Sequence, residues 1–110
     1  MIKSNRFFGR LIYNNHSLIL KNMENLRKKI VKIDQKIVKL LGERMKVAKK
    51  IGDIKKKAGI PIWDKQKENE LRKLHDEAGK KDGLTPKFIN KLFDVVFEES
   101  RRIQKSEKIE

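Results

Sequence analysis

An arginine interrupts an otherwise apolar series of residues, and it is the first indication of chemistry in the sequence. Arg44 lies between Leu40 and Val47, in a series of positions spaced alternately by four and three residues. Burying an unpaired guanidinium costs on the order of several kcal/mol, so we expect Arg44 to face an anion. That anion could be a carboxylate of the protein or a bound ligand, and a helix face open to solvent here would also accommodate the charge.

A second cation, Lys55, follows Arg44 on the same predicted helix face. Their separation of 11 residues corresponds to about three turns and a remaining rotation of roughly 20°, with Cα atoms about 16 Å apart. Two long side chains at that distance could flank one small dianion. Arg27 lies roughly 25 Å from Arg44 and is rotated by about 100°, so only a second copy of the chain could bring Arg27 to the same ligand. Arg27 and Lys55 could equally be solvated surface charges.

Two further pairs of polar residues are spaced by four, which places each pair on one helix face. Asp64 and Glu68, with Lys67 between them, lie where a second helix is expected to begin. Asp64 could simply cap that helix, and Glu68 could favour its positive end. Ser100 and Gln104 continue an apolar helix face, where a buried amide needs hydrogen-bonding partners.

The elements that must position these residues are helices. The apolar series runs from Leu26 to Ala58, which predicts one long helix from about Glu24 to Ala58. Such a helix would be roughly 50 Å long, more than a compact monomer of this size needs, so we expect a partner to cover it. The sequence Gly59-Ile60-Pro61-Ile62 then predicts a tight turn.

Two shorter helices are predicted after this turn. Asp64 is a suitable N-cap for a helix ending near Gly79 and Gly83. Thr85, followed by proline, is typical of the start of a third helix, which extends to about Lys105. No segment shows the alternation typical of strands, so the predicted fold class is all-α: a three-helix chain with one long N-terminal helix.

Composition limits the possible functions. The 110 residues include 29 Lys or Arg and 15 Asp or Glu, for a formal net charge of +14, and their number suits one small domain. The chain has no cysteine and two histidines, so we expect no disulfide and no metal site. No apolar stretch approaches the roughly 18 to 20 residues that span a membrane. A module that binds nucleic acid or an acidic partner would suit the charge, but no base-stacking pattern or recognition motif supports it.

Residues 1–22 contain no acidic residue and differ from the rest, residues 23–110, which we expect to form the functional domain. The apolar runs of this segment are too short for a secretory signal. It could be an extension before a true start at Met23 or an organellar targeting segment. We otherwise expect the protein in the cytoplasm.

Several separated motifs together resemble the all-helical (type II) chorismate mutases. The resemblance covers about Glu24 to Lys105, and the order and spacing of its motifs make it more specific than any single pair of residues. The matching positions are Leu26-Arg27, Ile33-Asp34, Leu40-Leu41-Gly42-Glu43-Arg44, Ile51, Ile54-Lys55, Gly59-Ile60-Pro61-Ile62, Asp64, Glu68, Leu84, Phe88, Leu92-Phe93, Glu99-Ser100-Arg101 and Gln104.

The resemblance implies an intertwined homodimeric helical bundle with two equivalent active sites and no cofactor. The implied reaction is the Claisen rearrangement of chorismate to prephenate, in phenylalanine and tyrosine biosynthesis. By the same resemblance, Arg44 and Arg27 of the partner subunit bind the two substrate carboxylates, while Lys55 and Gln104 hydrogen-bond the ether oxygen. Such a reaction needs orientation and charge stabilisation but no nucleophile.

The resemblance also implies roles for the remaining polar residues. Asp64 and Glu68 would address the ring hydroxyl and order the site, with Ser100 a further polar contact; Glu68 is then counted as catalytic with Lys55, Gln104 and Arg44. The main departure is Lys67, where the family usually has arginine, because lysine keeps the charge but loses the bidentate fork. The nearest alternative is an isochorismate pyruvate-lyase of the same fold, which the retained Asp64 and Glu68 disfavour.

Overall fold

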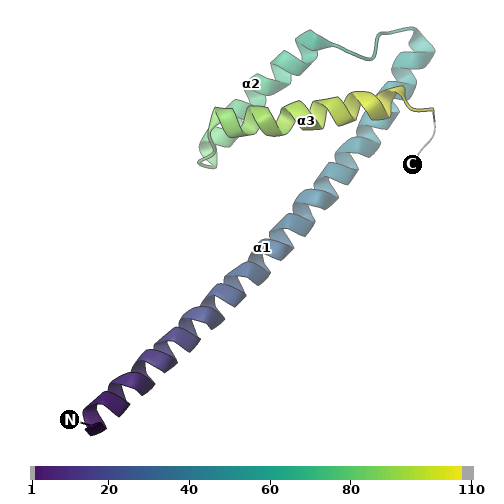
Figure 1. The fold of residues 1–110 in the computed structure, drawn as a ribbon. Coiled ribbons are helices and arrows are strands. Elements are labelled where there is room, and N and C mark those ends of the chain that lie inside the picture. The colour runs from purple at the N-terminus through teal and green to yellow at the C-terminus, as the bar shows by residue number, and fades with distance from the viewer. Residues whose placement is uncertain (1, 108–110) are drawn as a thin grey trace. The chain divides into compact units, whose positions relative to one another are not determined.

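The described part of the chain forms three helices (Figure 1): α1 (Ile2–Ala58), α2 (Lys65–Lys81) and α3 (Pro86–Lys105). The computed structural model describes the backbone of residues 2–107 and the side chains of residues 15–107. Within that part of the chain there is no strand. The prediction of an all-α, three-helix chain with a long N-terminal helix is therefore confirmed.

The start of the long helix was predicted wrongly. Helix α1 begins at Ile2, whereas the sequence pattern suggested a start near Glu24. No proline occurs between these positions and Gly9 is the only glycine, so nothing there interrupts the backbone hydrogen bonds of a helix. The apolar periodicity shows which part of the helix carries an apolar face. It does not show where the helix begins.

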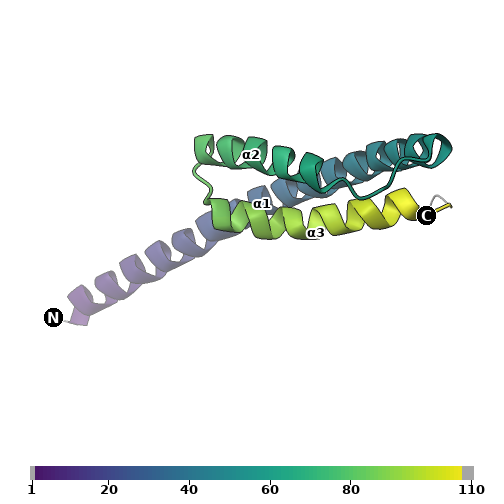
Figure 2. The ribbon, with the colours of Figure 1, turned by 90° about the horizontal axis from the view of Figure 1, so that it is seen from above.

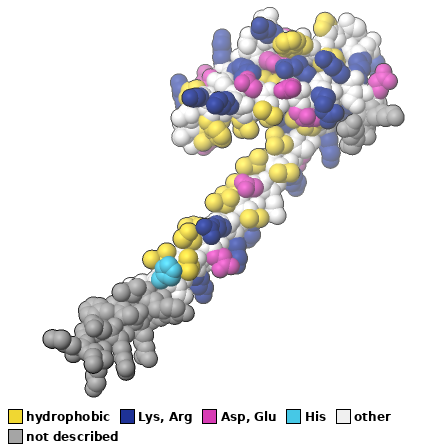
Figure 3. Space-filling view, viewed as in Figure 1, with side chains coloured by type: hydrophobic (Ala, Val, Ile, Leu, Met, Phe, Trp, Pro, Cys, Tyr) yellow, Lys and Arg dark blue, Asp and Glu magenta, His cyan; other side chains and the backbone are white. Residues whose placement is uncertain are grey.

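The chain divides into two structural units, Met1–Leu40 and Leu41–Glu110. The described side chains of the first unit all belong to α1 and are all exposed. Figure 3 shows its apolar side chains exposed along the helix. The exposed large apolar side chains are Leu18, Ile19, Leu20, Met23, Leu26, Ile30, Val31, Ile33, Ile37, Val38 and Leu40. An exposed apolar surface of this extent is typical of an interaction face.

In the second unit, the helix ends follow the predicted turn and capping chemistry. Helix α1 ends before Gly59, which has a positive φ of 68°. The Asp64 side chain caps α2 by accepting a hydrogen bond from the Lys67 backbone N–H. The Thr85 side chain caps α3 by accepting a hydrogen bond from the Phe88 backbone N–H. Each cap satisfies a backbone donor that the first turn of a helix leaves free. Both predicted N-caps are confirmed.

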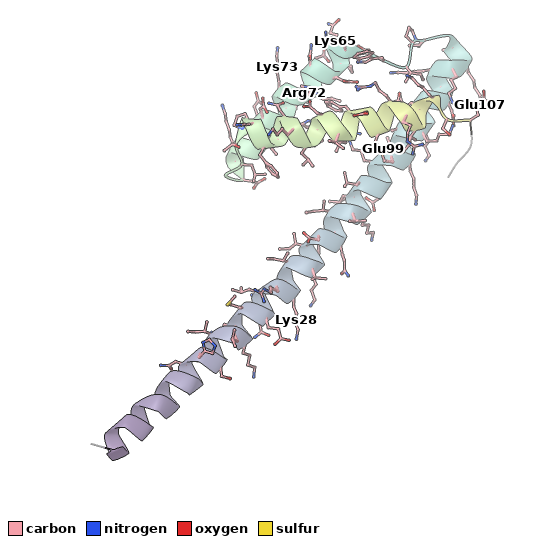
Figure 4. The ribbon with its side chains drawn as sticks, viewed as in Figure 1. Lys28, Lys65, Arg72, Lys73, Glu99 and Glu107 are labelled. Carbon is pink, nitrogen blue, oxygen red and sulfur yellow. The ribbon has the colours of Figure 1, made fainter. Side chains whose placement is uncertain are left out.

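Helices α2 and α3 lie side by side (Figure 2) and are joined by polar and aromatic contacts. Arg72 of α2 (Figure 4) donates a 2.6 Å hydrogen bond to Asp94 of α3 and lies over the Phe97 ring, 4.9 Å from its centroid. His75 stacks on Phe93, with ring centroids 3.7 Å apart. These contacts fix α2 against the face of α3 that carries the buried polar residues.

The apolar core of the second unit is small. The buried apolar side chains are Ala48, Ile89, Val96 and Phe97, and the most buried of them, Phe97, is 3% exposed. Small domains bury a low share of their surface, and oligomerisation is one of the ways in which they gain stability.

A glycine sets the distance between the last part of α1 and α3. A Cβ added at Gly52 would lie 2.6 Å from both the Cα and the carbonyl oxygen of Gln104, so only glycine fits there. The end of α3 is also held by Lys49 and Lys56, whose ammonium groups both donate to the carbonyl oxygen of Ser106. The backbone at Gln104 is thereby fixed against α1.

Candidate active site

A pocket of about 430 Å³ lies in the second unit, between the last part of α1, the turn that follows it, α2 and α3. Seven of the residues singled out from the sequence line it: Arg44, Lys55, Asp64, Lys67, Glu68, Ser100 and Gln104. The eighth, Arg27, belongs to the first unit and is not among the lining residues. The seven residues that were predicted to reach the site from a single chain therefore line one pocket of that chain.

Arg44 is partly buried and lies over the Phe97 ring, 5.6 Å from its centroid. Within the part of the chain that the structure describes, no residue forms an ion pair or hydrogen bond with its guanidinium. Burial lowers the pKa of Arg44 and the negative charge of Glu68 raises it, but an arginine stays charged at neutral pH. The structure therefore shows no structural ion pair of Arg44 inside the described part of this unit. The charge of Arg44 is available to an anionic ligand.

Lys55 is oriented by the turn that follows α1. Its Nζ atom donates a 3.1 Å hydrogen bond to the carbonyl oxygen of Ile62. The turn reverses the chain at Gly59, and the Ile60 N–H closes it on the Lys55 carbonyl at 2.8 Å. A neutral carbonyl holds the ammonium without cancelling its charge, so Lys55 remains a positioned cation at the pocket wall.

Ser100 and Gln104 are both buried, as their place on the apolar face of α3 predicted. The Gln104 Nε2 atom donates a 3.1 Å hydrogen bond to the Ser100 hydroxyl. The other amide atom, Oε1, is buried with no hydrogen-bond partner. A buried amide atom left without a partner is costly, and it marks a place where a polar ligand atom would be stabilised.

Asp64 and Lys67 are engaged in contacts of their own helix. Asp64 Oδ1 accepts a 3.0 Å hydrogen bond from the Lys67 backbone N–H as the cap of α2. The Lys67 ammonium lies 3.3 Å from the Glu70 carboxylate, on a side chain that is 71% exposed. An exposed pair of this kind contributes little to stability.

Glu68 forms the most buried ion pair of the pocket, and its partner was not predicted. The Nη1 atom of Arg101 lies 2.7 and 2.6 Å from the two Glu68 carboxylate oxygens. The Arg101 guanidinium also lies over the Trp63 ring, 4.9 Å from its centroid. Sequence spacing gave no signal for this pair, because it joins residues 33 positions apart on two helices.

The charges of the lining residues define the kind of ligand that the pocket suits. Four lining side chains are cationic (Arg44, Lys55, Lys67 and Arg101) and two are carboxylates (Asp64 and Glu68). Among the described residues there is no cluster of three side chains able to hold a metal ion, and no helix that could cross a membrane. Fold and pocket together define an all-helical protein with a pocket whose lining is mainly cationic, which suits a small organic anion.

Comparison with known proteins agrees with this class. The model of the family "Chorismate mutase type II" matches residues 26–105. The chorismate mutase of Methanocaldococcus jannaschii is 32% identical over 87 residues, which are 79% of this chain and 88% of that protein. The chain belongs to the type II chorismate mutase family, as its motifs predicted, and its activity class is that of an isomerase.

Two bifunctional chorismate mutase/prephenate dehydratases are also similar to the chain. The protein of Aquifex aeolicus is 46% identical over 52 residues, or 47% of this chain and 14% of that protein. The protein of Escherichia coli strain K12 is 33% identical over 75 residues, or 68% of this chain and 19% of that protein. Neither the pyruvate-lyase nor the nucleic-acid-binding alternative finds support in these relatives.

Proposed function

We propose that a homodimer of this chain converts chorismate to prephenate in the pocket between α1, α2 and α3. The observation that carries the proposal is Arg44, a partly buried guanidinium at the pocket wall with no carboxylate partner among the described residues. The substrate is a dicarboxylate, so its charge complements a pocket with four cationic and two acidic side chains.

The chemistry asks for orientation and charge stabilisation. In the rearrangement a C–O bond breaks as a C–C bond forms, with no proton transfer and no covalent intermediate. The protein must hold the enolpyruvyl side chain over the ring and stabilise the negative charge that develops on the ether oxygen. Lys55 is a suitable donor because the Ile62 carbonyl orients it without neutralising it.

Gln104 supplies the second donor to the ether oxygen. A serine hydroxyl can donate as well as accept, so half a turn of the Gln104 amide keeps the hydrogen bond to Ser100 with Oε1 as its acceptor. The amide nitrogen then occupies the place of the atom that has no partner. Ser100 is thus a partner for the Gln104 amide in either orientation.

The second substrate carboxylate is bound by Arg27 of the partner subunit. Two features of one chain support a second copy: the exposed apolar face of α1 in the first unit, and the small apolar core of the second. Burying an apolar face against its equivalent in a second copy would give a symmetric dimer with two equivalent sites.

Asp64, Glu68 and Lys67 complete the substrate site in this proposal. Glu68 accepts a hydrogen bond from the ring hydroxyl. Asp64 holds the first turn of α2, which carries Glu68, by capping it. Lys67 adds a positive charge at the rim.

The direct test is to incubate the purified protein with chorismate and to identify the product, beside an Arg44→Ala variant. We expect prephenate from the wild type and a loss of at least about 100-fold in kcat/KM for the variant. No conversion of chorismate by a folded dimer would contradict the proposal. Pyruvate released from isochorismate would then support the lyase, and steeply salt-dependent DNA binding would support the basic module.

The division of the chain at residue 22 is part of the proposal. A chain of residues 23–110 should keep the kcat and KM of the full chain, because the lining residues of the pocket and Arg27 all lie after Met23. A fall in activity on truncation would give residues 1–22 a role in the enzyme. The cytoplasmic location remains a prediction from the sequence.

A further inference from the structure

Arg101 is the one cation of the pocket that is already engaged by a carboxylate of the pocket. Its side chain is 24% exposed and that of Glu68 is 18% exposed, so both groups of the pair are largely withdrawn from water. Removing one partner of such a pair leaves a charge with poor solvation. The freed Glu68 carboxylate would therefore turn to another positive charge of the pocket.

The other cations near Glu68 show what that charge would be. Lys67 is on the same helix, but its ammonium is exposed and engaged by Glu70. The Lys55 ammonium is held by the Ile62 carbonyl. Arg44 lines the same pocket as Glu68 and forms no ion pair within the described residues, and the negative charge of Glu68 raises the pKa of Arg44. Glu68 freed from Arg101 would be drawn to Arg44, the guanidinium that is proposed to bind a substrate carboxylate.

The geometry of the pair suits a role in positioning. A carboxylate offers about four lone-pair directions, and the single Nη1 atom of Arg101 engages both oxygens from one side. The remaining lone pairs stay open to a donor from the ligand. The Trp63 ring lies under the guanidinium at 4.9 Å, and this cation–π contact restricts where the guanidinium can move.

We propose that Arg101 is a positioning residue, which holds the Glu68 carboxylate away from Arg44 and in place to accept a hydrogen bond from the hydroxyl group of the substrate. The inference rests on the proposed function, because the ligand is the dianion that Arg44 binds. It adds to the site a residue on α3 that acts through Glu68 and does not itself contact the substrate.

The test is a double-mutant cycle of Arg101→Met and Glu68→Gln, measured as kcat and KM for chorismate. Arg101→Met alone should raise KM by about 10-fold or more, because Glu68 then competes with the substrate for Arg44. In the Glu68→Gln background the same change should alter kcat/KM by less than about 2-fold, because no carboxylate remains to be held. Arg101→Lys should recover part of the loss, since it restores the charge without the planar fork.

The matched control is Arg102→Met on the next residue of α3, whose side chain is 54% exposed and pairs with Glu99 of the same helix. This variant should leave kcat and KM unchanged. Thermal unfolding and dimer mass are measured for every variant, and if Arg101→Met does not fold, Arg101→Lys and Glu68→Gln form the cycle.

Two results would overturn the inference while leaving the proposed function intact. In the first, the wild type converts chorismate and the Arg101 variants have the same KM as the wild type. The other is an Arg101 effect that is as large with Gln at position 68 as with Glu, which would mean direct contact with the substrate. A wild type with no activity on chorismate would instead mean that the proposed function has failed.

Discussion

At the scale of one residue, the proposed ligand-binding role of Arg44 conflicts with the stability of the ligand-free chain. A partly buried charge without a direct ion pair is unfavourable in the ligand-free chain, and the charge of Glu68 and stacking over Phe97 offset only part of that cost. We expect Arg44→Leu to raise the free energy of unfolding by up to about 1 kcal/mol, because the apolar replacement packs on the same ring. Urea unfolding measures the change, and a clear loss of stability would instead assign Arg44 a structural role.

Lys55 should matter to turnover far more than to folding. Within the described residues, the hydrogen bond of its ammonium is to the Ile62 backbone carbonyl, and water can replace it in a variant. Removing one positioned donor to a developing oxyanion typically costs about 10² to 10³ in kcat. We therefore expect a loss of that size for Lys55→Ala, with a melting temperature close to that of the wild type. An unchanged kcat would remove Lys55 from the mechanism.

His75 gives the second unit a pH-dependent stability. Burial and the charges of Arg44 and Arg72 lower the pKa of His75, and Asp76 raises it by less. The unfolded chain therefore takes up a proton at higher pH than the folded chain does, so stability is complete above about pH 6.5 and falls as the pH drops below it.

The measurement is the urea midpoint at pH 7.5 and at pH 5.5. We expect a lower midpoint at the acidic pH in the wild type, and a smaller difference in His75→Gln, which cannot take up the proton. His16→Gln, in the first unit, is the matched control and should retain the wild-type difference. If the urea midpoint of His75→Gln fell by as much as that of the wild type, groups other than His75 would cause the pH dependence.

At the scale of the elements, sequence reasoning succeeds where the signal is local. The caps at Asp64 and Thr85 and the turn at Gly59 depend on residues within a few positions of each other, so their chemistry can be read directly. The start of α1 could not be placed, because no breaker occurs upstream. The Arg101–Glu68 pair could not be found either, because it exists only once α2 and α3 have packed.

Gly52 is the clearest residue that periodicity missed, although an isolated glycine inside a helix is itself a signal of close packing. A methyl group there would meet the backbone of Gln104 at 2.6 Å. We expect Gly52→Ala to destabilise the fold by about 1 to 3 kcal/mol and to lower kcat, because α3 must move and takes Gln104 with it.

Gly42→Ala is the control on the same helix, since a Cβ there meets nothing within 4 Å. This variant should gain about 0.5 to 1 kcal/mol through helix propensity alone. Chemical denaturation and steady-state kinetics on both variants separate the two effects. Equal stability of the two variants would show that α1 and α3 do not approach as closely as this contact requires.

At the scale of the whole molecule, one chain supplies most but not all of what the reaction is proposed to need. The pocket contains every predicted site residue except Arg27. Helix geometry predicted that Arg27 could not reach the ligand from its own chain, and periodicity predicted a face that needs a partner. The sequence cannot give the pairing geometry of two copies, because that depends on which of many apolar positions meet.

The proposed active sites each combine residues of two chains, so two inactive variants should restore activity in a mixed dimer. An Arg27→Ala chain and a Lys55→Ala chain should each have little activity alone. Mixed in urea and refolded together, about half of the dimers pair one chain of each kind, and each of these has one site with both wild-type residues. The mixture should recover about a quarter of the wild-type activity. Refolded mixtures no more active than either variant would mean that Arg27 and Lys55 serve the same chain's site. An Arg27→Ala chain that is fully active alone would mean that the partner's arginine takes no part.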